Sequence, residues 1–377
     1  MRLPALAEDV GDTLFRLFPH RVPTGLRAIG APGRGSPVLL TGNYALTVRR
    51  LERVLAGRAA WLLVANSRGV NVWCAAGGGH LTHHDVISVI RTSGVGERVD
   101  GRRVVLPQLA ATGVERRLVT EATGWSACWG PARLEDLPAF LDRGSRVRRE
   151  ERRMGFPLIR RLEMAAVWSP WLALPGAALV GLVGGWRAAG AGALVAPGAC
   201  FPLYALLPRL RVTGRGRWLT YLGFAGAGAA AGAAALALLG AAAAANLLAV
   251  GAVSLASMLL LSLDLPGTTP VHPSSVGDQT EAARIELQQE RCRGHADCVL
   301  VCPRDVLAMN GRRRQVAIAR PQDCIRCGAC IVQCPEDALR FRYDDGRVVG
   351  PDVVRSTRLN LLGRRGVRLG PADRRRT

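Results

Sequence analysis

Residues 324–335 have the sequence Cys324-Ile-Arg-Cys327-Gly-Ala-Cys330-Ile-Val-Gln-Cys334-Pro335. This C-x2-C-x2-C-x3-C-P spacing places three thiolates on one tight turn, where they can hold one face of a cubane iron–sulfur cluster. The fourth cysteine of such a run reaches a second cluster. Zinc is the alternative, but zinc ribbons rarely carry four cysteines this close together with a proline after them. The run therefore predicts an iron–sulfur domain near the C-terminus.

An earlier run has the same frame: Cys292-Arg-Gly-His295-Ala-Asp-Cys298-Val-Leu-Val-Cys302-Pro303, with histidine in place of the second cysteine. Together the two runs resemble the bacterial two-cluster ferredoxins, which implies an α+β ferredoxin domain at residues 286–343 holding two 4Fe-4S clusters. The two expected ligand sets are Cys302, Cys324, Cys327 and Cys330 for one cluster, and Cys292, Cys298 and Cys334 for the other. Two outcomes are open for His295: it ligates iron, or it stays free beside a three-iron cluster.

Residues 164–263 form four apolar segments, Met164–Leu182, Ala188–Leu207, Trp218–Leu239 and Ala243–Leu261. Each approaches the roughly 20 residues that a helix needs to cross a bilayer. A buried bundle in a soluble protein is the alternative, but four such runs in succession exceed what a single core needs. We therefore expect an α-helical transmembrane bundle in contact with membrane lipid.

The charge distribution predicts the orientation of this bundle. The net charge is +21, and every basic residue is Arg. Arginines crowd residues 143–161 and the second loop, at 209–217, whereas the first loop has only Arg187. The positive-inside rule then places both soluble parts in the cytoplasm, on a multi-pass protein of the inner membrane. We expect no nucleic-acid partner, because no basic face with interleaved aromatics is found.

Residues 38–142 alternate strand and helix patterns. This alternation predicts an α/β Rossmann-like, doubly wound sheet that is mostly parallel, with ligands at the carboxyl ends of its strands. The expected strands are Val38–Leu40, Trp61–Val64, Val104–Leu106 and Ser126–Trp129, and the expected helices are Tyr44–Ala56, Asp85–Ser93, Val114–Thr123 and Glu135–Leu141. The remaining segments are expected to be a loosely structured leader (1–37, with an amphipathic piece at Asp12–Phe18), a basic linker (143–163), a connector (264–285) and a basic tail without clear pattern (344–377).

The segment Asn71-Val-Trp-Cys74-Ala-Ala-Gly-Gly-Gly79 follows the second expected strand. Taken alone, it is a weak signal, because a lone cysteine among small apolar residues is usually a packed core residue. The glycine run would allow a backbone to approach a ligand closely.

Residues 38–142 resemble the corrinoid-binding domain of the mercury-methylating corrinoid proteins, themselves related to the corrinoid subunits of CO dehydrogenase/acetyl-CoA synthase. In that family the domain precedes a membrane bundle, and a two-cluster ferredoxin is the partner protein. The pieces that carry the resemblance are Thr41-Gly-Asn-Tyr44, Gly69-Val-Asn-Val-Trp-Cys-Ala-Ala-Gly77, Val105-Leu-Pro-Gln-Leu109, Gly113-Val114, Gly130-Pro131 and Asp136-Leu-Pro-Ala-Phe140.

The resemblance implies that Cys74 is the catalytic residue and binds the cobalt of a cobalamin-type corrinoid from below. It implies a membrane-bound methyltransferase whose fused ferredoxin returns cobalt to its reduced state. The methyl group would come from a donor protein or a methylated pterin and pass to Hg(II) or another soft acceptor, and a separate electron donor would supply the ferredoxin. The residues expected to bind the corrinoid are Asn43, Asn71, Val72, Trp73, Cys74, Ala75, Ala76, Gly77 and Gln108.

The chain departs from the family pattern in three places. Gly78 stands where the family has Lys, His295 replaces a cluster cysteine, and no cysteine follows Cys334. The family bundle also has five spans where four are counted here. These departures bear on mercury as the substrate. They leave a second hypothesis, a membrane-anchored iron–sulfur electron carrier with a vestigial or repurposed corrinoid domain.

Overall fold

The computed structural model describes residues 11, 13–16, 18–212, 216–264, 283–312, 314–359 and 365–368. Most of the expected connector and the end of the basic tail lie outside these residues. The chain divides into two units: residues 1–17 with 156–266, and residues 18–155 with 267–377. The first is a helical bundle. The second contains the α/β domain and the iron–sulfur domain.

The α/β domain is built on a five-stranded sheet of order β1-β3-β2-β4-β5. The strands β2, β3, β4 and β5 are parallel to their neighbours, and β1 pairs with β3 in the antiparallel direction. The mixed α/β fold is therefore confirmed. The strand bounds are β1 (Gly25–Ile29), β2 (Val38–Gly42), β3 (Ala60–Ala65), β4 (Arg103–Leu106) and β5 (Ser126–Trp129).

The strand β1 lies within the stretch that was expected to be a loose leader, so the boundary at residue 38 is too late. Its sequence, Gly-Leu-Arg-Ala-Ile, is only five residues long and carries a single polar residue, which is too little to show an alternating pattern. It is an edge strand, paired on one side only. Such a strand needs little hydrophobic patterning of its own, which is why the sequence did not reveal it.

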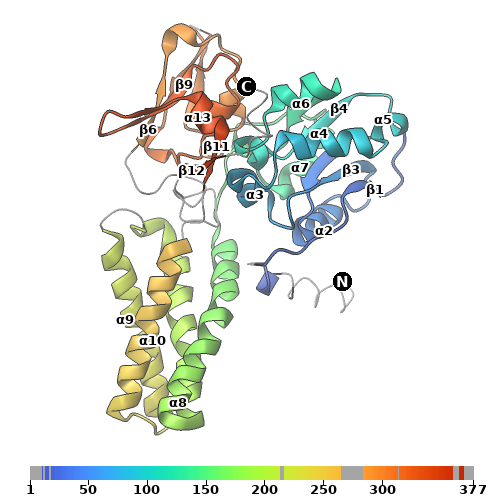
Figure 1. Cartoon of the computed structure of the whole chain (residues 1–377). Helices are drawn as coiled ribbons and strands as arrows, with labels where there is room; N and C mark the ends of the chain where they lie inside the picture. The colour runs from blue at the N-terminus through green and yellow to red at the C-terminus, as the bar shows by residue number, and fades with distance from the viewer. Residues whose placement is uncertain are drawn as a thin grey trace. The chain divides into compact units, whose positions relative to one another are not determined.

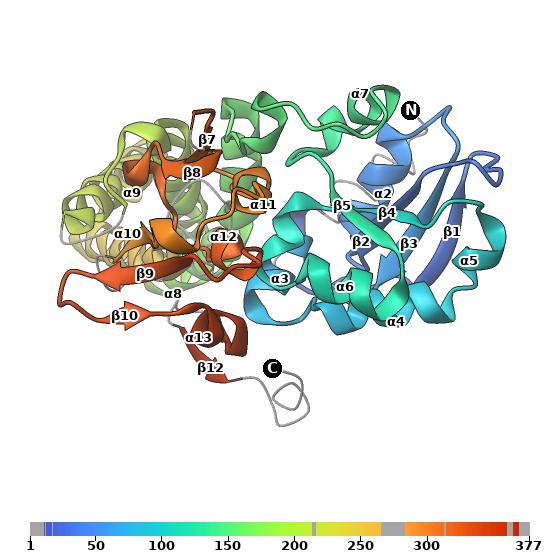
Figure 2. The same ribbon diagram turned by 90° about the horizontal axis from the view of Figure 1, so that it is seen from above.

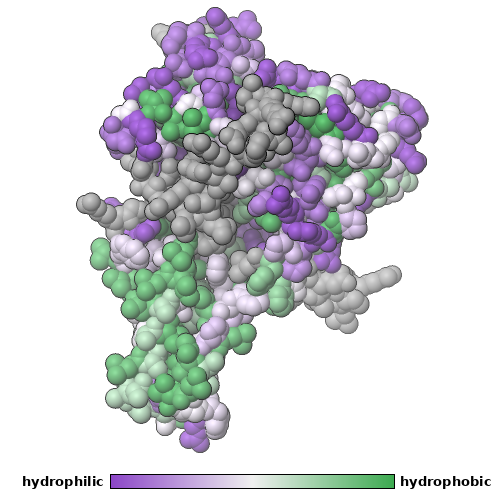
Figure 3. Space-filling model, viewed as in Figure 1, coloured by the Kyte–Doolittle hydropathy of each residue, from purple (hydrophilic) through white to green (hydrophobic). Residues whose placement is uncertain are grey.

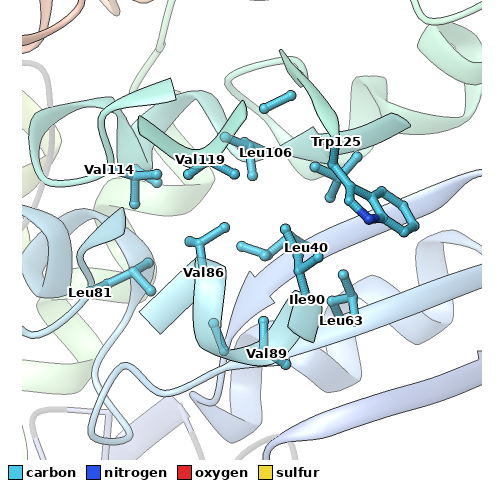
Figure 4. Packing of buried hydrophobic residues seen from close by; sticks show 14 of the residues in the cluster. Leu40, Leu63, Leu81, Val86, Val89, Ile90, Leu106, Val114, Val119 and Trp125 are labelled. Carbon is cyan, nitrogen blue, oxygen red and sulfur yellow. The ribbon is translucent and has the colours of Figure 1, made fainter. Parts of the chain in front are cut away.

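Helices cover both faces of the sheet, as a doubly wound fold requires. On β2, Leu39 packs toward one face and Leu40 toward the other. In Figure 4, Leu40 and Leu63 of the sheet lie against Val86 and Ile90 of α4. The helix bounds are α2 (Ala45–Val54), α3 (Val72–Gly78), α4 (His83–Thr92), α5 (Val95–Arg98), the 3-10 helix η1 (Gln108–Thr112), α6 (Arg116–Thr123) and α7 (Leu137–Asp142).

The iron–sulfur domain consists of a small antiparallel sheet, a hairpin and two short helices. Each short helix follows the first cysteines of one cysteine run. The elements are β6 (Ala283–Leu287), α11 (Asp297–Leu300), β7 (Leu307–Asn310), β8 (Gln315–Ile318), α12 (Ala329–Val332), β9 (Leu339–Tyr343) and β10 (Val348–Val349). The sheet has the order β10-β9-β6, and β7 pairs with β8.

The expectation of a patternless tail from residue 344 onward is wrong for its first part. Helix α13 (Pro351–Ser356) and strand β11 (Thr357–Leu359) follow β10, and β11 pairs with β12 (Arg365–Arg368). The Arg355 side chain fixes this segment by donating hydrogen bonds to the carbonyl oxygens at the end of α12, among them that of Cys334 at 3.0 Å. The sequence did not predict this contact, because α13 is short and its apolar pattern is weak.

The helical unit contains α8 (Leu158–Leu206), α9 (Arg217–Leu238) and α10 (Ala244–Asp264), which pack side by side (Figure 1). Helix α8 is interrupted at Gly185, whose φ of 74° and ψ of −171° are not helical. Its two halves fold back on each other, since a Cβ at Gly176 would lie 3.2 Å from the carbonyl oxygen of Gly192. The four apolar segments therefore correspond to the two halves of α8, to α9 and to α10.

Three described helices are long and apolar enough to cross a membrane: Leu158–Arg209, Arg217–Leu238 and Ala244–Leu263. The bundle carries apolar side chains on its outside, where Leu182 is 85% and Leu238 is 88% exposed. In Figure 3 hydrophobic residues gather over α8, α9 and α10. Contiguous apolar surface of this kind is rare on soluble monomers. It is the surface expected of a bundle that faces lipid.

Candidate functional site

Four cysteines line one cavity in the iron–sulfur domain: Cys302, Cys324, Cys327 and Cys330 (the four-cysteine group). The rest of its wall is largely apolar and includes Ile285, Val306 and Phe341. Burial raises the pKa of Cys324 to about 11 and the pKa of Cys330 well above its usual range, and the nearby Cys302 adds to both shifts. The structure thus brings together the four cysteines that are expected to bind one of the two clusters.

A second set, Cys292, Cys298 and Cys334 (the three-cysteine group), lies together in the core of the iron–sulfur domain. All three side chains are buried. Burial and, to a smaller extent, the neighbouring Cys334 and Cys292 raise the pKa of Cys298 to about 12. The last cysteine of each run therefore lies with the earlier cysteines of the other run, Cys302 in the four-cysteine group and Cys334 in the three-cysteine group.

The donor chemistry of both groups fits polynuclear iron–sulfur centres. Crowded, buried thiols stay neutral unless a cation stabilises the thiolates, and bound iron supplies that charge. Backbone N–H groups already point at the sulfurs: those of Val306 and Ala338 lie 3.3 Å from the Sγ atoms of Cys302 and Cys334, respectively. Such hydrogen bonds tune cluster potentials. Among the described residues, no three His, Cys, Asp or Glu side chains are grouped so as to hold a single metal ion.

His295 lies at the surface of the iron–sulfur domain. Its Nε2 is 2.9 Å from Oε1 of Glu336, and its side chain is 49% exposed. The imidazole is therefore engaged on one nitrogen by a carboxylate.

Cys74 lies on α3, a helix of seven residues. The Asn71 side chain caps this helix by accepting a hydrogen bond from the backbone N–H of Cys74 at 3.0 Å. Behind it, Ala75 and Ala76 are fully buried, and a Cβ at Gly113 would lie 2.4 Å from the carbonyl oxygen of Ala76. The small residues are thus required for close packing, and the Cys74 side chain is left half-buried on the opposite side.

Asn43 holds the loop that leads into α3. Its Oδ1 accepts hydrogen bonds from the backbone N–H groups of Ser67, at 2.9 Å, and Gly69, at 3.0 Å. Asn43 is only 4% exposed. The structure therefore gives this expected cofactor residue a positioning role. Ser67, which shares the contact, was not predicted.

Gln108 follows β4, beside the point where the strand order reverses between β2 and β4. Its Nε2 donates to the carbonyl oxygens of Arg152 at 3.0 Å and Leu300 at 3.1 Å. Its Oε1, like Nε1 of Trp73, is buried with no hydrogen-bond partner among the described residues. A corrinoid carries amide groups around its ring, which can donate to the first atom and accept from the second. With the thiol of Cys74, these atoms make a donor set that fits a corrinoid.

The iron–sulfur domain packs against this part of the α/β domain (Figure 2). Trp73 and Ile325 are both buried against each other, and Cys74, Leu109 and Cys327 pack on this pair. Val301 and Ala329 complete the apolar core that contains α4 and α6. An expected cluster ligand, Cys327, and the expected cobalt ligand, Cys74, thus share one apolar contact.

One glutamine of the iron–sulfur domain fastens the two domains together. Gln333 donates from Nε2 to the carbonyl oxygens of Ala111 and Val114, both at 2.8 Å. Its Oε1 accepts from the backbone N–H of Arg116 at 3.1 Å. Three backbone groups at the end of η1 and the start of α6 therefore find their partner in the other domain. Gln333 lies inside the cysteine run, but no sequence signal marked it.

Ion pairs also join the iron–sulfur domain to the α/β domain and to the basic linker. Arg116 binds Asp297 at 2.7 Å, and Arg149 of the basic linker binds the buried Asp305 at 2.9 Å. The backbone N–H of Met154 donates to the carbonyl oxygen of Pro303 at 2.8 Å. The basic linker therefore binds the iron–sulfur domain through an ion pair and a backbone hydrogen bond, in addition to carrying positive charge.

Two family models match separate parts of the chain, one in the α/β domain and one in the iron–sulfur domain. Residues 16–141 match the family model of the CO dehydrogenase/acetyl-CoA synthase delta subunit, and residues 318–340 match that of the 4Fe-4S binding domain. The N-terminal domain is thus related to corrinoid/iron–sulfur proteins, and the chain carries a 4Fe-4S domain.

Three relatives illustrate the similarity. The acetyl-CoA decarbonylase/synthase complex subunit gamma of Archaeoglobus fulgidus is 35% identical over 127 residues, 33% of this chain and 27% of the relative. The same subunit of Methanopyrus kandleri is 36% identical over 135 residues, 35% and 29% of the two chains. The corrinoid/iron-sulfur protein large subunit of Moorella thermoacetica is 27% identical over 124 residues, 32% and 27% of the two chains. The matches thus span less than a third of each relative.

Proposed function

We propose that this protein is a membrane-bound, corrinoid-dependent methyltransferase with its own electron-transfer domain. The observation that carries the proposal is the contact of Cys74 and Cys327 with one buried pair, Trp73 and Ile325, in a domain related to corrinoid/iron–sulfur proteins. The expected cobalt ligand and an expected cluster ligand therefore pack on the same two side chains, which supports the proposal. The relatives' names support a corrinoid and iron–sulfur clusters as cofactors.

In this proposal Cys74 supplies a soft thiolate to cobalt, and the capped helix α3 holds that thiol in place. A bound corrinoid would supply a metal that takes up and releases a methyl group. Asn71 and Asn43 fix the backbone around Cys74, and Trp73 and Gln108 offer their unpaired polar atoms to the amides of the ring. The residues of the chain thus position the cofactor and connect it to the clusters.

We propose a soft electrophile as the methyl acceptor, with Hg(II) as one member of that class. If Cys74 holds a corrinoid, electron donation from its thiolate to the metal would favour transfer of the methyl group as a carbanion equivalent. The loss of the family lysine at Gly78 and the lack of cysteines after Cys334 favour an acceptor other than mercury. A methyl donor protein or a methylated pterin would load the cofactor. Because the relatives are named as subunits of a complex, we expect protein partners.

We further propose that the helical unit spans the inner membrane and keeps both soluble domains in the cytoplasm. The fold-back at Gly185 makes an even number of apolar segments, which returns the chain to the side on which it started. This arrangement is supported by the arginines of the linker and of the loop before α9.

For the three-cysteine group we propose a three-iron cluster, with His295 outside the ligand set. We expect His295→Ala to leave the electron paramagnetic resonance (EPR) spectra of both clusters unchanged, because the histidine is half-exposed at the surface whereas the three cysteines are buried. Cys298→Ala serves as the positive control and should abolish one signal. Loss or shift of one signal in His295→Ala would instead show that the histidine ligates iron.

The experiment that tests the proposed function is the cofactor content of the full-length protein, extracted anaerobically from membranes with detergent. We expect about one cobalt per chain, with iron and sulfide for two clusters. Iron without cobalt, even after a corrinoid is supplied, would overturn the proposal. That result would leave the second hypothesis, a membrane-anchored electron carrier. The packing of Ile325 and Cys327 around Trp73 and Cys74 favours this hypothesis. Recovery of the protein in the soluble fraction would overturn the membrane placement alone.

A further inference from the structure

The two cysteine groups have different surroundings. The residue after the first cysteine of each run shows this most clearly. Ile325, in the second run, is 4% exposed and packs on Trp73 of the α/β domain. The equivalent residue of the first run, Arg293, is exposed. The second run is therefore turned toward Cys74, and the loop of the first run is turned toward solvent.

The ligands follow the same division. Cys327 of the four-cysteine group packs on the Trp73–Ile325 pair and on the core of the α/β domain. Cys292, Cys298 and Cys334 belong to the iron–sulfur domain's own core, as do Cys302, Cys324 and Cys330, so Cys327 is the expected ligand that packs on the α/β domain. Near the three-cysteine group, the solvent-facing contact is the exposed pair His295 and Glu336. Tunnelling rates fall steeply with distance, so the order in which electrons visit the clusters follows from this placement.

We propose that the four-cysteine group is the exit cluster, and that electrons cross from its Cys327 side to Cys74 through the Trp73–Ile325 contact. The three-cysteine group is then the entry cluster, and the exposed loop Arg293–His295 is where an external donor comes closest. One electron leaves the four-cysteine group, which oxidises that cluster by one unit and reduces cobalt at Cys74 from Co(II) to Co(I). No proton is transferred. An external low-potential one-electron carrier restores the cluster. This inference rests on the proposed function.

The fastening residues hold this route in place. Gln333 and the pair Arg116–Asp297 lock α11 and α12 onto the α/β domain, so the exit side does not depend on a transient encounter. Ile325 is a positioning residue in this scheme, because its side chain fills the contact without bearing a redox group.

The test uses the full-length protein, loaded with clusters and cob(II)alamin, and compares the Cys330→Ala and Cys298→Ala variants by EPR. The magnetic interaction between a reduced cluster and Co(II) falls with the cube of their separation. We expect Cys330→Ala to abolish the cluster-induced broadening of the Co(II) signal and Cys298→Ala to preserve it. Broadening that survives Cys330→Ala but is lost in Cys298→Ala would overturn the inference. A wild-type protein that binds no cobalt would instead overturn the proposed function.

A second pair of variants keeps all the ligands and guards against misfolding of the first. With the clusters reduced by a light flash, Ile325→Ala should slow reduction of Co(II) several-fold and leave the EPR spectra of both clusters unchanged. The matched control, Arg293→Ala, should leave this internal step unaffected. Equal rates in the two variants would overturn the role given to Ile325.

Discussion

Replacing Cys74 with alanine is expected to change the visible spectrum of the bound corrinoid and to weaken its binding. In the proposed function the Cys74 thiolate is the soft donor to cobalt, and a methyl group in its place would leave the metal to water or to a base of the cofactor itself. Loss even of an outer partner of a metal ligand costs about 10–100-fold in affinity, so loss of the ligand should cost at least that much. The measurement is a titration of the purified Cys74→Ala protein with cob(II)alamin, followed by absorbance.

The matched control is Cys128→Ala. Cys128 is also a partly buried cysteine of the α/β domain, but it lies on β5, where its Sγ accepts a hydrogen bond from Nε of Arg103 at 3.4 Å. It should bind corrinoid as the wild type does. Asn71→Ala should have an intermediate effect, because losing a helix cap costs about 1 kcal/mol and leaves the thiol present. An unchanged spectrum in Cys74→Ala would remove thiolate ligation from the proposal.

The parts of the site that could be predicted from sequence are those set by short-range geometry. In C-x2-C-x2-C the backbone between neighbouring cysteines is too short to point them apart, so the residues from Cys324 to Cys330 converge whatever surrounds them. The strands β2 to β5 are similarly local, because each is a short run of mostly apolar residues. The apolar segments of the bundle were predicted from length and hydropathy. The gap between the first two segments contains Gly185, where helix α8 is interrupted.

The contacts between domains could not be predicted in this way. Gln333 and Ala111 are 222 residues apart, and Gln108 and Leu300 are 192 apart. No periodicity in one sequence links such positions. A glutamine within a cysteine run does not stand out in the sequence either. Its role depends on three backbone groups near the start of α6, in a distant part of the chain. The sequence placed Asn43 and Gln108 near the ligand through resemblance alone, whereas the structure shows that both hold backbone segments in position.

Replacing Gln333 with alanine is expected to release the iron–sulfur domain from the α/β domain. The substitution leaves the carbonyl oxygens of Ala111 and Val114 and the N–H of Arg116 without their partner. Each unsatisfied buried group costs about 1–3 kcal/mol, so the docked arrangement should lose at least about 3 kcal/mol. Hydrogen exchange measured by mass spectrometry should then accelerate in residues 108–120. EPR must show that both clusters are intact, since Cys334 is the next residue.

Two further variants separate loss of these hydrogen bonds from general damage. Gln289→Ala removes an exposed glutamine of the same domain, whose Nε2 contacts Gln315 at 2.8 Å, and should leave exchange in residues 108–120 unchanged. Gln333→Glu keeps the size of the side chain but faces two carbonyl oxygens with a carboxylate, which has no hydrogen to donate when ionised. It should accelerate exchange at least as much as alanine does. If both Gln333 variants exchange like the wild type, the ferredoxin is held by the apolar contact at Trp73 and by the linker arginines, and an electron route through Ile325 would no longer depend on Gln333.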